Sequence, residues 1–407
     1  MKKVDGGVTA VQGFEAASVA AGIKYKDRMD MALIYSKVPA SVAGVFTTNV
    51  VKASPVKWDM AIIKECETAQ AMVFNSGIAN ACTGKEGDTV NEAMAKAVAD
   101  ALNLKTKAVL TASTGVIGMP IPVDKVTVGG KLLVDNLKSD LEAGHNAAKA
   151  IMTTDTIPKE VAVEFTVTGK TVRLAGMSKG SGMIHPNMAT MLAVVTTDVA
   201  IKKELLQKAL SKDVKDTFNM ISVDRDTSTN DTLIVLANGL AGNAVIDSEN
   251  EDYQAFCEAL HFVNETLAKL IAQDGEGASK LLEAKVIGAK TKEEAVLLSK
   301  AVITSNLVKT AIFGRDANWG RILCALGYAG VEFDPEKVDL YIESESGKLK
   351  LVENGLTADF SEEFATMILS DKEVTAICEM HQGEASATAW GCDLTYDYVK
   401  INGDYRS

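Results

Sequence analysis

Residues 179–192 read KGSGMIHPNMATML, a glycine-rich loop that runs into a short apolar segment. The preceding residues 161–174 alternate apolar and polar side chains around a Gly-Lys pair, which predicts a two-stranded hairpin. Residues 191–195 are an apolar run of strand length. We therefore expect Ala189 and Thr190 to lie where an irregular loop enters a buried strand.

Thr190 is a candidate nucleophile at this junction. A glycine-rich loop can bend the peptide bond after Ala189 out of its relaxed geometry, while the strand holds the next side chain rigidly. The Thr190 hydroxyl can then attack the Ala189 carbonyl, and hydrolysis of the resulting ester would free Thr190 as a new amino terminus. Its α-amine, with a reference pKa of roughly 8, would serve as the base for its own hydroxyl. On this pattern alone, an ordinary buried strand threonine is the more frequent alternative.

Besides residues 179–192, eight further stretches are informative, four before this segment and four after it. They read FTTNVVKASPV, NSGIANACTG, TASTGVIG, IMTTDT, DRDTSTNDT, DGEGASKL, FGRDANWGRI and, at the end, INGDYRS. Together the nine stretches resemble the ornithine acetyltransferase family, also called glutamate N-acetyltransferase or arginine biosynthesis bifunctional protein. The resemblance covers essentially the whole chain. Two departures are Ile78, where asparagine is usual in the family, and Arg225, where glycine is usual.

The resemblance implies an enzyme of the cyclic arginine pathway. It would move an acetyl group from N2-acetyl-L-ornithine to L-glutamate in a ping-pong reaction through an acetyl-Thr190 ester. Self-cleavage between Ala189 and Thr190 would give an α chain, residues 1–189, and a β chain, residues 190–407, which assemble as two of each. Neither a cofactor nor a metal is implied, and the use of acetyl-CoA as a second acetyl donor stays open.

Composition narrows the classes of protein to consider. A chain of 407 residues is too long for one ordinary core and suggests two domains or two interleaved halves. The net charge of −12 argues against nucleic acid or an anionic membrane as partner. No stretch approaches 18 consecutive apolar residues, and the sequence MKKVDGG is no apolar leader. Six scattered cysteines without a CxxC motif favour free thiols in a reducing cytoplasm over zinc or disulfides.

Strand and helix patterns alternate along the chain. Apolar runs at residues 71–75 and 233–237 predict buried strands, and helical spacing recurs at residues 252–272. Thr89 and Glu92 form a capping-box pattern that predicts the start of another helix. We expect an α/β fold of layered mixed sheets with helices outside. The resemblance implies the type found in self-cleaving aminopeptidases and ornithine acetyltransferases.

The stretch ASTG, residues 112–115, follows a predicted strand at residues 107–111. Such a turn can aim a hydroxyl and a backbone N–H into a cavity, and one oxyanion donor is typically worth about 3 kcal/mol in the transition state. A simple turn is the alternative from the pattern alone. The resemblance assigns Thr114 and Gly115 to the oxyanion hole.

Both expected substrates carry an α-carboxylate, which calls for a fixed cation and for hydroxyl or N–H donors. From the pattern alone, Lys179 is an ordinary loop lysine, Thr153 and Thr154 are a helix-terminal turn, and Glu276 is a surface carboxylate. The resemblance implies these substrate contacts: Lys179, Thr190, Glu276, Asn402, Ser407 and one of Thr153 and Thr154. The contacts at the chain end require that the tail be tied back into the fold.

The sequence leaves three alternatives open, one for a loop and two for the function. The polar residues 223–232 suggest either a cation loop or a hydrogen-bonded turn, and the turn is favoured because EF-hand Gly and Glu positions are missing. A self-processing N-terminal-threonine aminopeptidase or amidohydrolase is the alternative enzyme. A non-catalytic binding protein, which would persist as one uncut chain, is the alternative outside catalysis.

Overall fold

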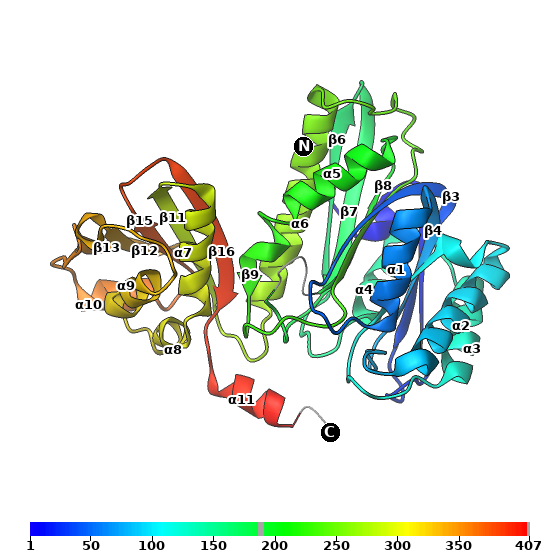
Figure 1. The fold of residues 1–407 in the computed structure, drawn as a ribbon, viewed down its shortest axis with the longest axis horizontal. Helices are drawn as coiled ribbons and strands as arrows, with labels where there is room; N and C mark the ends of the chain where they lie inside the picture. The colour runs from blue at the N-terminus through cyan, green and yellow to red at the C-terminus, as the bar shows by residue number, and fades with distance from the viewer. Residues whose placement is uncertain (186–190, 405–407) are drawn as a thin grey trace. The chain divides into compact units, whose positions relative to one another are not determined.

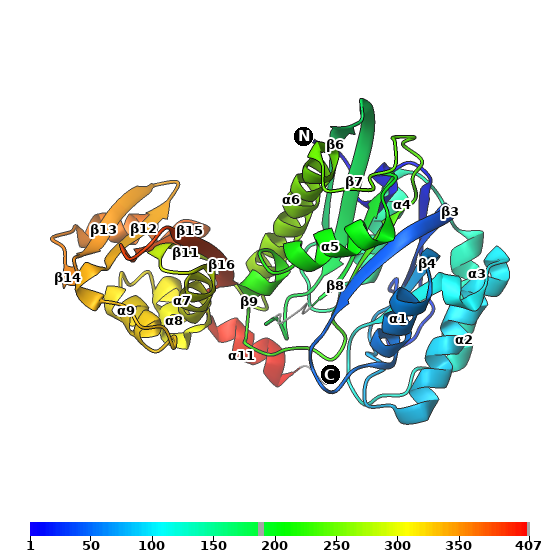
Figure 2. The same cartoon turned by 45° about the horizontal axis from the view of Figure 1, so that its top comes forward.

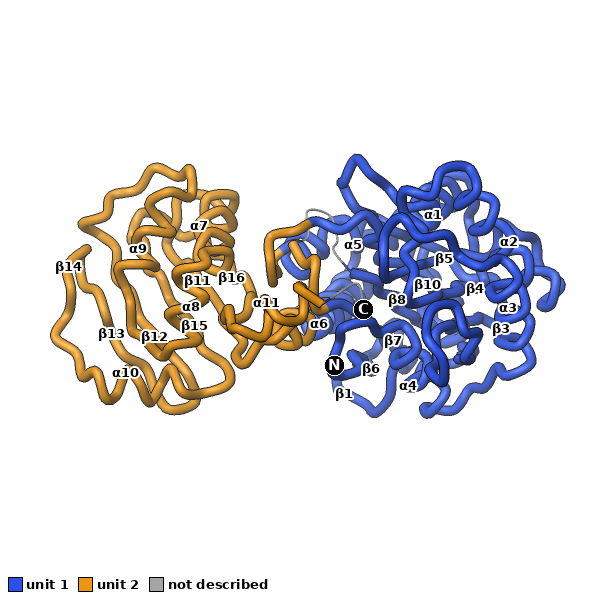
Figure 3. The backbone as a smooth tube through the Cα atoms, turned by 90° about the horizontal axis from the view of Figure 1, so that it is seen from below, with its two compact units in different colours: residues 1–180, 186–219, 227–267 blue, residues 181–185, 220–226, 268–407 orange. Residues whose placement is uncertain are grey.

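The computed structural model of the protein describes residues 1–185 and 191–404 (Figure 1). The chain divides into two compact units, which Figure 3 colours separately. Unit 1 takes residues 1–180, 186–219 and 227–267, and unit 2 takes residues 181–185, 220–226 and 268–407. Each unit contains segments from both sides of position 189. The compact units are therefore interleaved along the chain, and the expected cleavage products 1–189 and 190–407 would each contribute to both.

Unit 1 is built on a mixed sheet of nine strands within the described residues. Its order is β1-β6-β7-β8-β10-β3-β4-β5, and β2 pairs with β3. The pairs β8–β10 and β4–β5 are parallel, and the other neighbours are antiparallel. The strands are β1 (Lys2–Val4), β2 (Phe14–Val19), β3 (Met31–Phe46), β4 (Thr68–Asn75), β5 (Val109–Ser113), β6 (Lys159–Val167), β7 (Lys170–Lys179), β8 (Leu192–Thr197) and β10 (Thr232–Ala237).

The central strands of this sheet are buried on both faces. In β4, Met72 and Phe74 pack in one apolar cluster, whereas Ala71 and Val73 pack in another. Side chains alternate between the faces of a strand, so a strand covered on both sides reads as a continuous apolar run. The covering helices, visible in Figures 1 and 2, are α1 (Ser54–Glu65), α2 (Gly84–Leu102), α3 (Val123–Asp135), α4 (Leu141–Ala150) and α5 (Lys203–Asp213).

Unit 2 has a second mixed sheet, of seven strands in order β14-β13-β12-β15-β11-β16-β9 within the described residues. Helix α7 packs on β11 and β16, where it buries Leu298 and Val302. The strands are β9 (Ile221–Ser222), β11 (Leu281–Ala289), β12 (Asp339–Ser344), β13 (Gly347–Glu353), β14 (Leu356–Thr357), β15 (Glu373–Glu379) and β16 (Ala385–Cys392). The helices are α7 (Lys292–Thr304), α8 (Asn306–Gly314), α9 (Trp319–Gly327), α10 (Glu362–Ile368) and α11 (Tyr396–Gly403), and α6 (Glu251–Gln273) belongs partly to each unit.

The expected α/β class, with layered mixed sheets and helices outside, is confirmed. The predicted hairpin is β6–β7, and its two turn residues, Thr168 and Gly169, have φ angles of 45° and 74°. Positive φ at both positions is the geometry of a two-residue turn that matches strand twist. The predicted helix start at Thr89 is wrong, because α2 begins at Gly84 and the Thr89 hydroxyl donates to the Lys85 carbonyl inside it.

Among the described residues, no single helix is long and apolar enough to cross a membrane. The helices α7 and α8 meet the length and composition criteria only as a pair, which is bent by 56°.

Candidate functional site

The ends of two parallel strands position the first candidate residues. β4 and β5 pair in register as far as Asn75 and Ser113, where both strands end. Just beyond, the Thr114 backbone N–H donates to the Asn75 carbonyl oxygen at 3.0 Å. Within residues 1–185 and 191–404, the Thr114 hydroxyl and the Gly115 backbone N–H have no hydrogen-bond partner. Two donors from adjacent residues are therefore available to an oxygen atom of a bound molecule.

Gly115 is required by the backbone at this position. Its φ is +127°, and a Cβ atom there would overlap the backbone of Gly77. A side chain is excluded on both grounds, so glycine is required at position 115. The departure at Ile78 leaves this arrangement intact, because Ile78 bridges to Thr114 and Val116 through backbone atoms only.

The side chain of Asn230 is hydrogen-bonded to the residue that precedes Thr114. Its buried side-chain amide donates to the carbonyl oxygen of Ser113 at 2.8 Å and to that of Ala79 at 2.6 Å. The Thr229 hydroxyl donates to the Asn230 side-chain oxygen at 2.6 Å, which orients the amide. These bonds agree with the expected hydrogen-bonded turn at residues 223–232. Because Ser113 and Ala79 flank the loop, Asn230 fixes the directions of the two donors.

The segment after the expected scission is anchored to the same turn. The Thr232 backbone N–H donates to the Met191 carbonyl oxygen at 2.9 Å, and Leu192 pairs with Lys179 across β7 and β8. Thr232 is two residues from Asn230, so one short segment positions both Met191 and the residue before Thr114. Ala189 and Thr190 themselves lie outside the described residues.

Lys179 belongs to a buried cluster of three charges. It is 7% exposed, and its Nζ lies 3.9 Å from an Asp155 carboxylate oxygen. The Nζ of fully buried Lys159 donates to the other oxygen at 2.7 Å. Burial by itself would raise the pKa of Asp155, but Lys179 and then Lys159 outweigh it and hold the pKa of this carboxyl well below its usual range. Among the described residues, two ammonium groups thus face one carboxylate in unit 1.

Asp155 also joins the threonine pair to the loop. Its carboxylate accepts the backbone N–H of Thr153 at 3.0 Å and that of Gly180 at 2.6 Å. Thr153 and Thr154 are both half-buried beside it. The structure therefore brings these two threonines and Lys179 together, as the resemblance implies. Sequence reasoning missed Asp155, although it follows Thr154 directly in IMTTDT.

Glu276 is buried in unit 2, contrary to the surface carboxylate that its pattern alone indicates. It is 7% exposed, and its carboxylate accepts a 2.8 Å hydrogen bond from the Asn402 side-chain amide. Its backbone N–H donates to the Ser181 carbonyl oxygen at 2.9 Å, and a Cβ at Gly182 would overlap its carboxylate. Glu276 and Asn402 thus meet as expected, against the start of the glycine-rich loop. Ser407 lies outside the described residues.

Asp224 fixes the next residues of that loop. Its carboxylate accepts the backbone N–H groups of Met183, at 2.6 Å, and Ile184, at 2.9 Å. Burial raises the pKa of Asp224, although these backbone bonds oppose the rise. The neighbouring Arg225 has φ +72°, a left-handed conformation, which explains why glycine suits this position better. Sequence reasoning had no indication of the role of Asp224.

His185 is half-buried at the end of the described part of the glycine-rich loop. Burial, followed by the charges of Lys300 and Arg225, lowers its pKa to about 4. Its Nδ1 lies 3.0 Å from the Ser222 hydroxyl. The imidazole is therefore neutral, in agreement with its interpretation as a loop residue.

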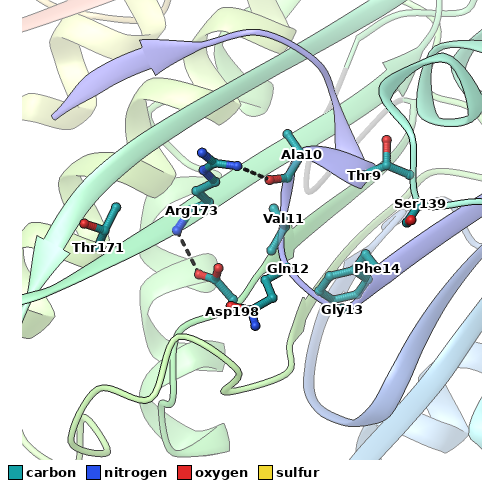
Figure 4. Close-up of a pocket in the computed structure, with 10 residues that line it drawn as sticks. All are labelled: Thr9, Ala10, Val11, Gln12, Gly13, Phe14, Ser139, Thr171, Arg173 and Asp198. Carbon is teal, nitrogen blue, oxygen red and sulfur yellow. Dashed lines mark hydrogen bonds between the residues drawn. The ribbon is translucent and has the colours of Figure 1, made fainter.

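A cavity of about 420 Å³ in unit 1 is lined by residues near the start of the chain together with Arg173 and Asp198 (Figure 4). Arg173 of β7 donates to the Ala10 carbonyl at 3.1 Å and, through its backbone, to the Asp198 carboxylate at 2.8 Å. Arg173 is six residues before Lys179, or roughly 20 Å along the strand. This cavity contains no residue predicted for the site.

One group of side chains has the spacing of metal ligands. Ligand atoms of Asp339, Glu379 and His381 in unit 2 lie within 4.8 Å of one another. The ammonium of Lys350 already lies 3.2 Å from the Asp339 carboxylate. A cation in that position disfavours a metal ion, because like charges repel at this distance.

Comparison with known proteins gives consistent matches. The sequence model of the ArgJ family matches residues 15–407. The arginine biosynthesis bifunctional protein ArgJ of Caldanaerobacter subterraneus is 53% identical over 407 residues and covers both chains completely. That of Thermotoga neapolitana is 50% identical over 397 residues, which are 97% of this chain and 99% of the relative. The crystal structure of the Bacillus halodurans protein of the same name is 47% identical with a TM-score of 0.50, and it covers 52% of this chain and 97% of the solved chain.

Proposed function

The chain belongs to the ArgJ family, and from this premise we propose its reaction. It is an acetyltransferase of arginine biosynthesis that moves the acetyl group of N2-acetyl-L-ornithine to L-glutamate. The products are L-ornithine and N-acetyl-L-glutamate. The observation that carries the proposal is a pair of donors without a partner among the described residues, the Thr114 hydroxyl and the Gly115 N–H, which follow a residue bonded to Asn230.

Thr190 is the nucleophile in this proposal. Its α-amine takes the hydroxyl proton while its oxygen attacks the acetyl carbonyl, and Thr114 and Gly115 stabilise the oxyanion. The carbon–nitrogen bond then breaks, and the proton passes from the α-amine to the departing ornithine nitrogen. The deprotonated amine of glutamate attacks the acetyl-Thr190 ester, so the acetyl group leaves as N-acetylglutamate and the hydroxyl is restored.

The charged clusters suit the two amino acids. Lys179, held beside Asp155, is the cation proposed for the α-carboxylate that both substrates share. Thr153 and Thr154 add hydroxyl donors at the same place. Glu276, which now accepts a bond from Asn402, is the anion proposed for a substrate ammonium. Because both clusters are largely buried, their interactions are strong and little screened by salt.

Self-cleavage between Ala189 and Thr190 is part of the proposal. Backbone N–H groups of Met183 and Ile184 are bonded to Asp224 within unit 2, and the Met191 carbonyl is bonded to Thr232 within unit 1, so the chain on each side of the scissile bond is anchored in its own unit. The solved Bacillus halodurans chain gives further support from its length. It is covered to 97% of its own length but covers only 52% of this chain, so it is about half as long, as expected of a separate chain such as residues 190–407.

Assembly and a second donor are also proposals. Two α and two β chains per molecule is the assembly that the resemblance implies, and analytical ultracentrifugation of the cleaved protein tests it. The relatives share the name bifunctional protein, which supports acetyl-CoA as an additional acetyl donor to glutamate. This second activity would make the protein an amino-acid N-acetyltransferase as well.

Initial-velocity kinetics with N-acetylornithine and glutamate test the reaction. A covalent acetyl-enzyme gives parallel lines in double-reciprocal plots at several glutamate concentrations. Intersecting lines would rule out the two-step scheme. Release of free acetate at an unchanged rate without glutamate would point to an amidohydrolase that uses the same nucleophile.

A further inference from the structure

The stretch NSGIANACTG begins at the end of strand β4, beside the loop that carries the proposed oxyanion donors. The Asn75 carbonyl oxygen accepts the Thr114 backbone N–H at 3.0 Å, and the Gly77 carbonyl oxygen accepts that of Val116 at 3.1 Å. These two bonds lie on either side of the donor pair. Ser76, the residue between the two carbonyl groups, is therefore part of the segment that supports the donors, although no step of the proposed reaction uses it.

The side chain of Ser76 connects this segment to helix α4. Ser76 is fully buried, and its hydroxyl donates to the Ala150 carbonyl oxygen at 2.8 Å, across 74 positions of the chain. Ala150 is the last residue of α4, and its carbonyl is one of the four that a helix end leaves without an internal partner. The proposed substrate contacts Thr153 and Thr154 follow within about four residues, which span at most about 14 Å. We call residues 150–154 the threonine turn.

Backbone bonds hold Ser76 itself in place. Its N–H donates to the Asp30 carbonyl oxygen at 2.9 Å. Asp30 is fully buried, and its carboxylate accepts the backbone N–H groups of Ala21 and Ile23, both at 2.7 Å. Because the backbone of Ser76 cannot shift without loss of these buried bonds, its hydroxyl offers the threonine turn a fixed attachment point.

A second link joins the same two segments nearer the surface. The half-buried Arg28 donates from its guanidinium to the carbonyl oxygen of Met152, the residue before Thr153. The guanidinium carbon also lies 5.1 Å from the centroid of the Tyr25 ring. That ring lies beside Gly77, since a Cβ atom there would be 3.4 Å from it. Arg28 and Tyr25 thus bridge Gly77 to the threonine turn.

We propose that Ser76 is a positioning residue that sets the spacing between the threonine turn and the oxyanion donors. The inference rests on the proposed function, in which the turn and Lys179 bind the α-carboxylate of the substrate while the donors bind its acetyl carbonyl. In N2-acetylornithine only the α-carbon and the α-nitrogen separate these two groups. The two segments must therefore be held at one distance for the carbonyl to reach the donors. The same spacing disfavours an acetyl group on the side-chain nitrogen, which lies farther from the carboxylate.

Two acetyl donors separate this role from general support of the site. N2-acetyl-L-ornithine uses both segments, whereas p-nitrophenyl acetate has no carboxylate and needs only the nucleophile and the oxyanion donors. The protein is expressed from the full-length chain. Acetyl exchange from N2-acetylornithine to glutamate gives kcat and KM, and the release of p-nitrophenol, corrected for that of Thr190→Ala, gives the rate with the second donor.

Ser76→Ala should lower kcat for N2-acetylornithine roughly tenfold, the effect of one lost buried hydrogen bond, and change KM less than about twofold. The substrate still binds, but its carbonyl reaches the oxyanion donors less often. The rate with p-nitrophenyl acetate should stay within about twofold of the wild type, because the backbone bonds from Thr114 and Val116 to this segment remain.

Ser36→Ala is the matched control. Ser36 is also fully buried, and its hydroxyl donates to the Val38 carbonyl oxygen at 2.7 Å. This variant should lower Tm by a similar amount and leave the rates with both donors unchanged. A loss of kcat in Ser36→Ala equal to that in Ser76→Ala would overturn the inference, because reduced stability alone would then explain it.

Three further outcomes are decisive. An unchanged kcat for N2-acetylornithine in Ser76→Ala would overturn the inference. Equal losses with both donors would also overturn it, because Ser76 would then support the donors and not the spacing. A wild type that reacts with p-nitrophenyl acetate but not with N2-acetylornithine would overturn the proposed function, and the inference with it.

Arg28→Gln tests the same spacing if Ser76→Ala does not fold, since Arg28 lies outside the buried core. It should lower kcat for N2-acetylornithine about threefold, a smaller loss because Ser76 still holds the turn, and leave the rate with p-nitrophenyl acetate unchanged. Lys26→Gln is its control, because Lys26 is exposed in the same loop. Equal kcat values for Arg28→Gln and Lys26→Gln would contradict the spacing role.

Discussion

The side-chain amide of Asn230 donates a 2.8 Å hydrogen bond to the carbonyl oxygen of Ser113, the residue that precedes Thr114. The two residues are 117 positions apart in the chain. Through this bond, the segment that anchors Met191 also fixes the proposed oxyanion donors. Met191 and the residue before Thr114 are thus both held by one short segment, residues 230–232.

Asn230→Ala should lower kcat by roughly 10- to 100-fold with little change in KM, because the oxyanion donors act mainly in the transition state. Steady-state kinetics of acetyl exchange measure this. Asn238→Ala is the matched control. Asn238 follows strand β10, whereas Asn230 precedes it, and the Asn238 side-chain amide donates to the Gln12 carbonyl oxygen at 2.9 Å. Equal losses of kcat in both variants would show that the effect is only structural.

Asp155→Asn should destabilise the protein by about 3–5 kcal/mol, because it leaves two buried lysines without their carboxylate. Lys179 and Lys159 lower the pKa of Asp155 in the folded state, so its stabilising contribution is present above the ordinary Asp pKa of 3.8. That contribution is lost as the pH falls below 3.8 towards the folded pKa. Denaturant unfolding between pH 3 and 7 measures both effects.

The control for this variant is Asp100→Asn, which removes an exposed pair with Lys96 on helix α2. Its effect should stay below about 1 kcal/mol. If Asp155→Asn changed stability no more than Asp100→Asn, the buried cluster would not hold the Thr153 turn and the start of the loop.

Asp59→Asn should stabilise the protein at neutral pH by about 1–2 kcal/mol. Burial raises the pKa of Asp59 well above its usual value, so the folded state becomes less stable as the pH rises through that raised pKa. An asparagine carries no such charge, and its amide can donate to the buried Thr111 hydroxyl oxygen, which has no partner among the described residues. Thermal melts at pH 4 and pH 8 should show a gain for the variant only at pH 8. A gain of the same size at both values would exclude ionisation as the cause.

Arg225→Gly should be about 1 kcal/mol more stable than Arg225→Ala, because residue 225 has φ +72°. Comparing these two variants separates backbone strain from loss of the exposed guanidinium. Urea denaturation of both measures the difference. Equal stability would show that the left-handed conformation carries no strain at this position.

Local sequence patterns correctly predicted elements whose formation depends on neighbouring residues, such as a hairpin turn and a long helix. The turn of the β6–β7 hairpin needs positive φ at Thr168 and Gly169, and the long helix α6 was predicted at residues 252–272, within one residue of Glu251–Gln273 at each end. The start of α2 was misplaced by five residues, because the capping-box pattern at Thr89 lies inside a helix that begins at Gly84.

The candidate site was predicted only in part, for a physical reason. Thr114, Lys179 and Glu276 came from a resemblance of motifs, whereas their partners are set by contacts between distant segments. Asp155 meets Gly180 across 25 residues, and Asn230 meets Ala79 across 151. No periodicity or spacing records such contacts, so only the fold reveals which buried polar groups hold the site in place.

In the proposed mechanism, Thr190 cuts the chain before itself and then carries the acetyl group. Intact-mass spectrometry of the wild type beside Thr190→Ala tests it most directly. We predict two fragments for the wild type, residues 1–189 and 190–407, with an acetyl adduct on the second after incubation with N-acetylornithine. We predict a single chain of 407 residues for Thr190→Ala. An uncut wild type that transfers acetyl groups would contradict the claim.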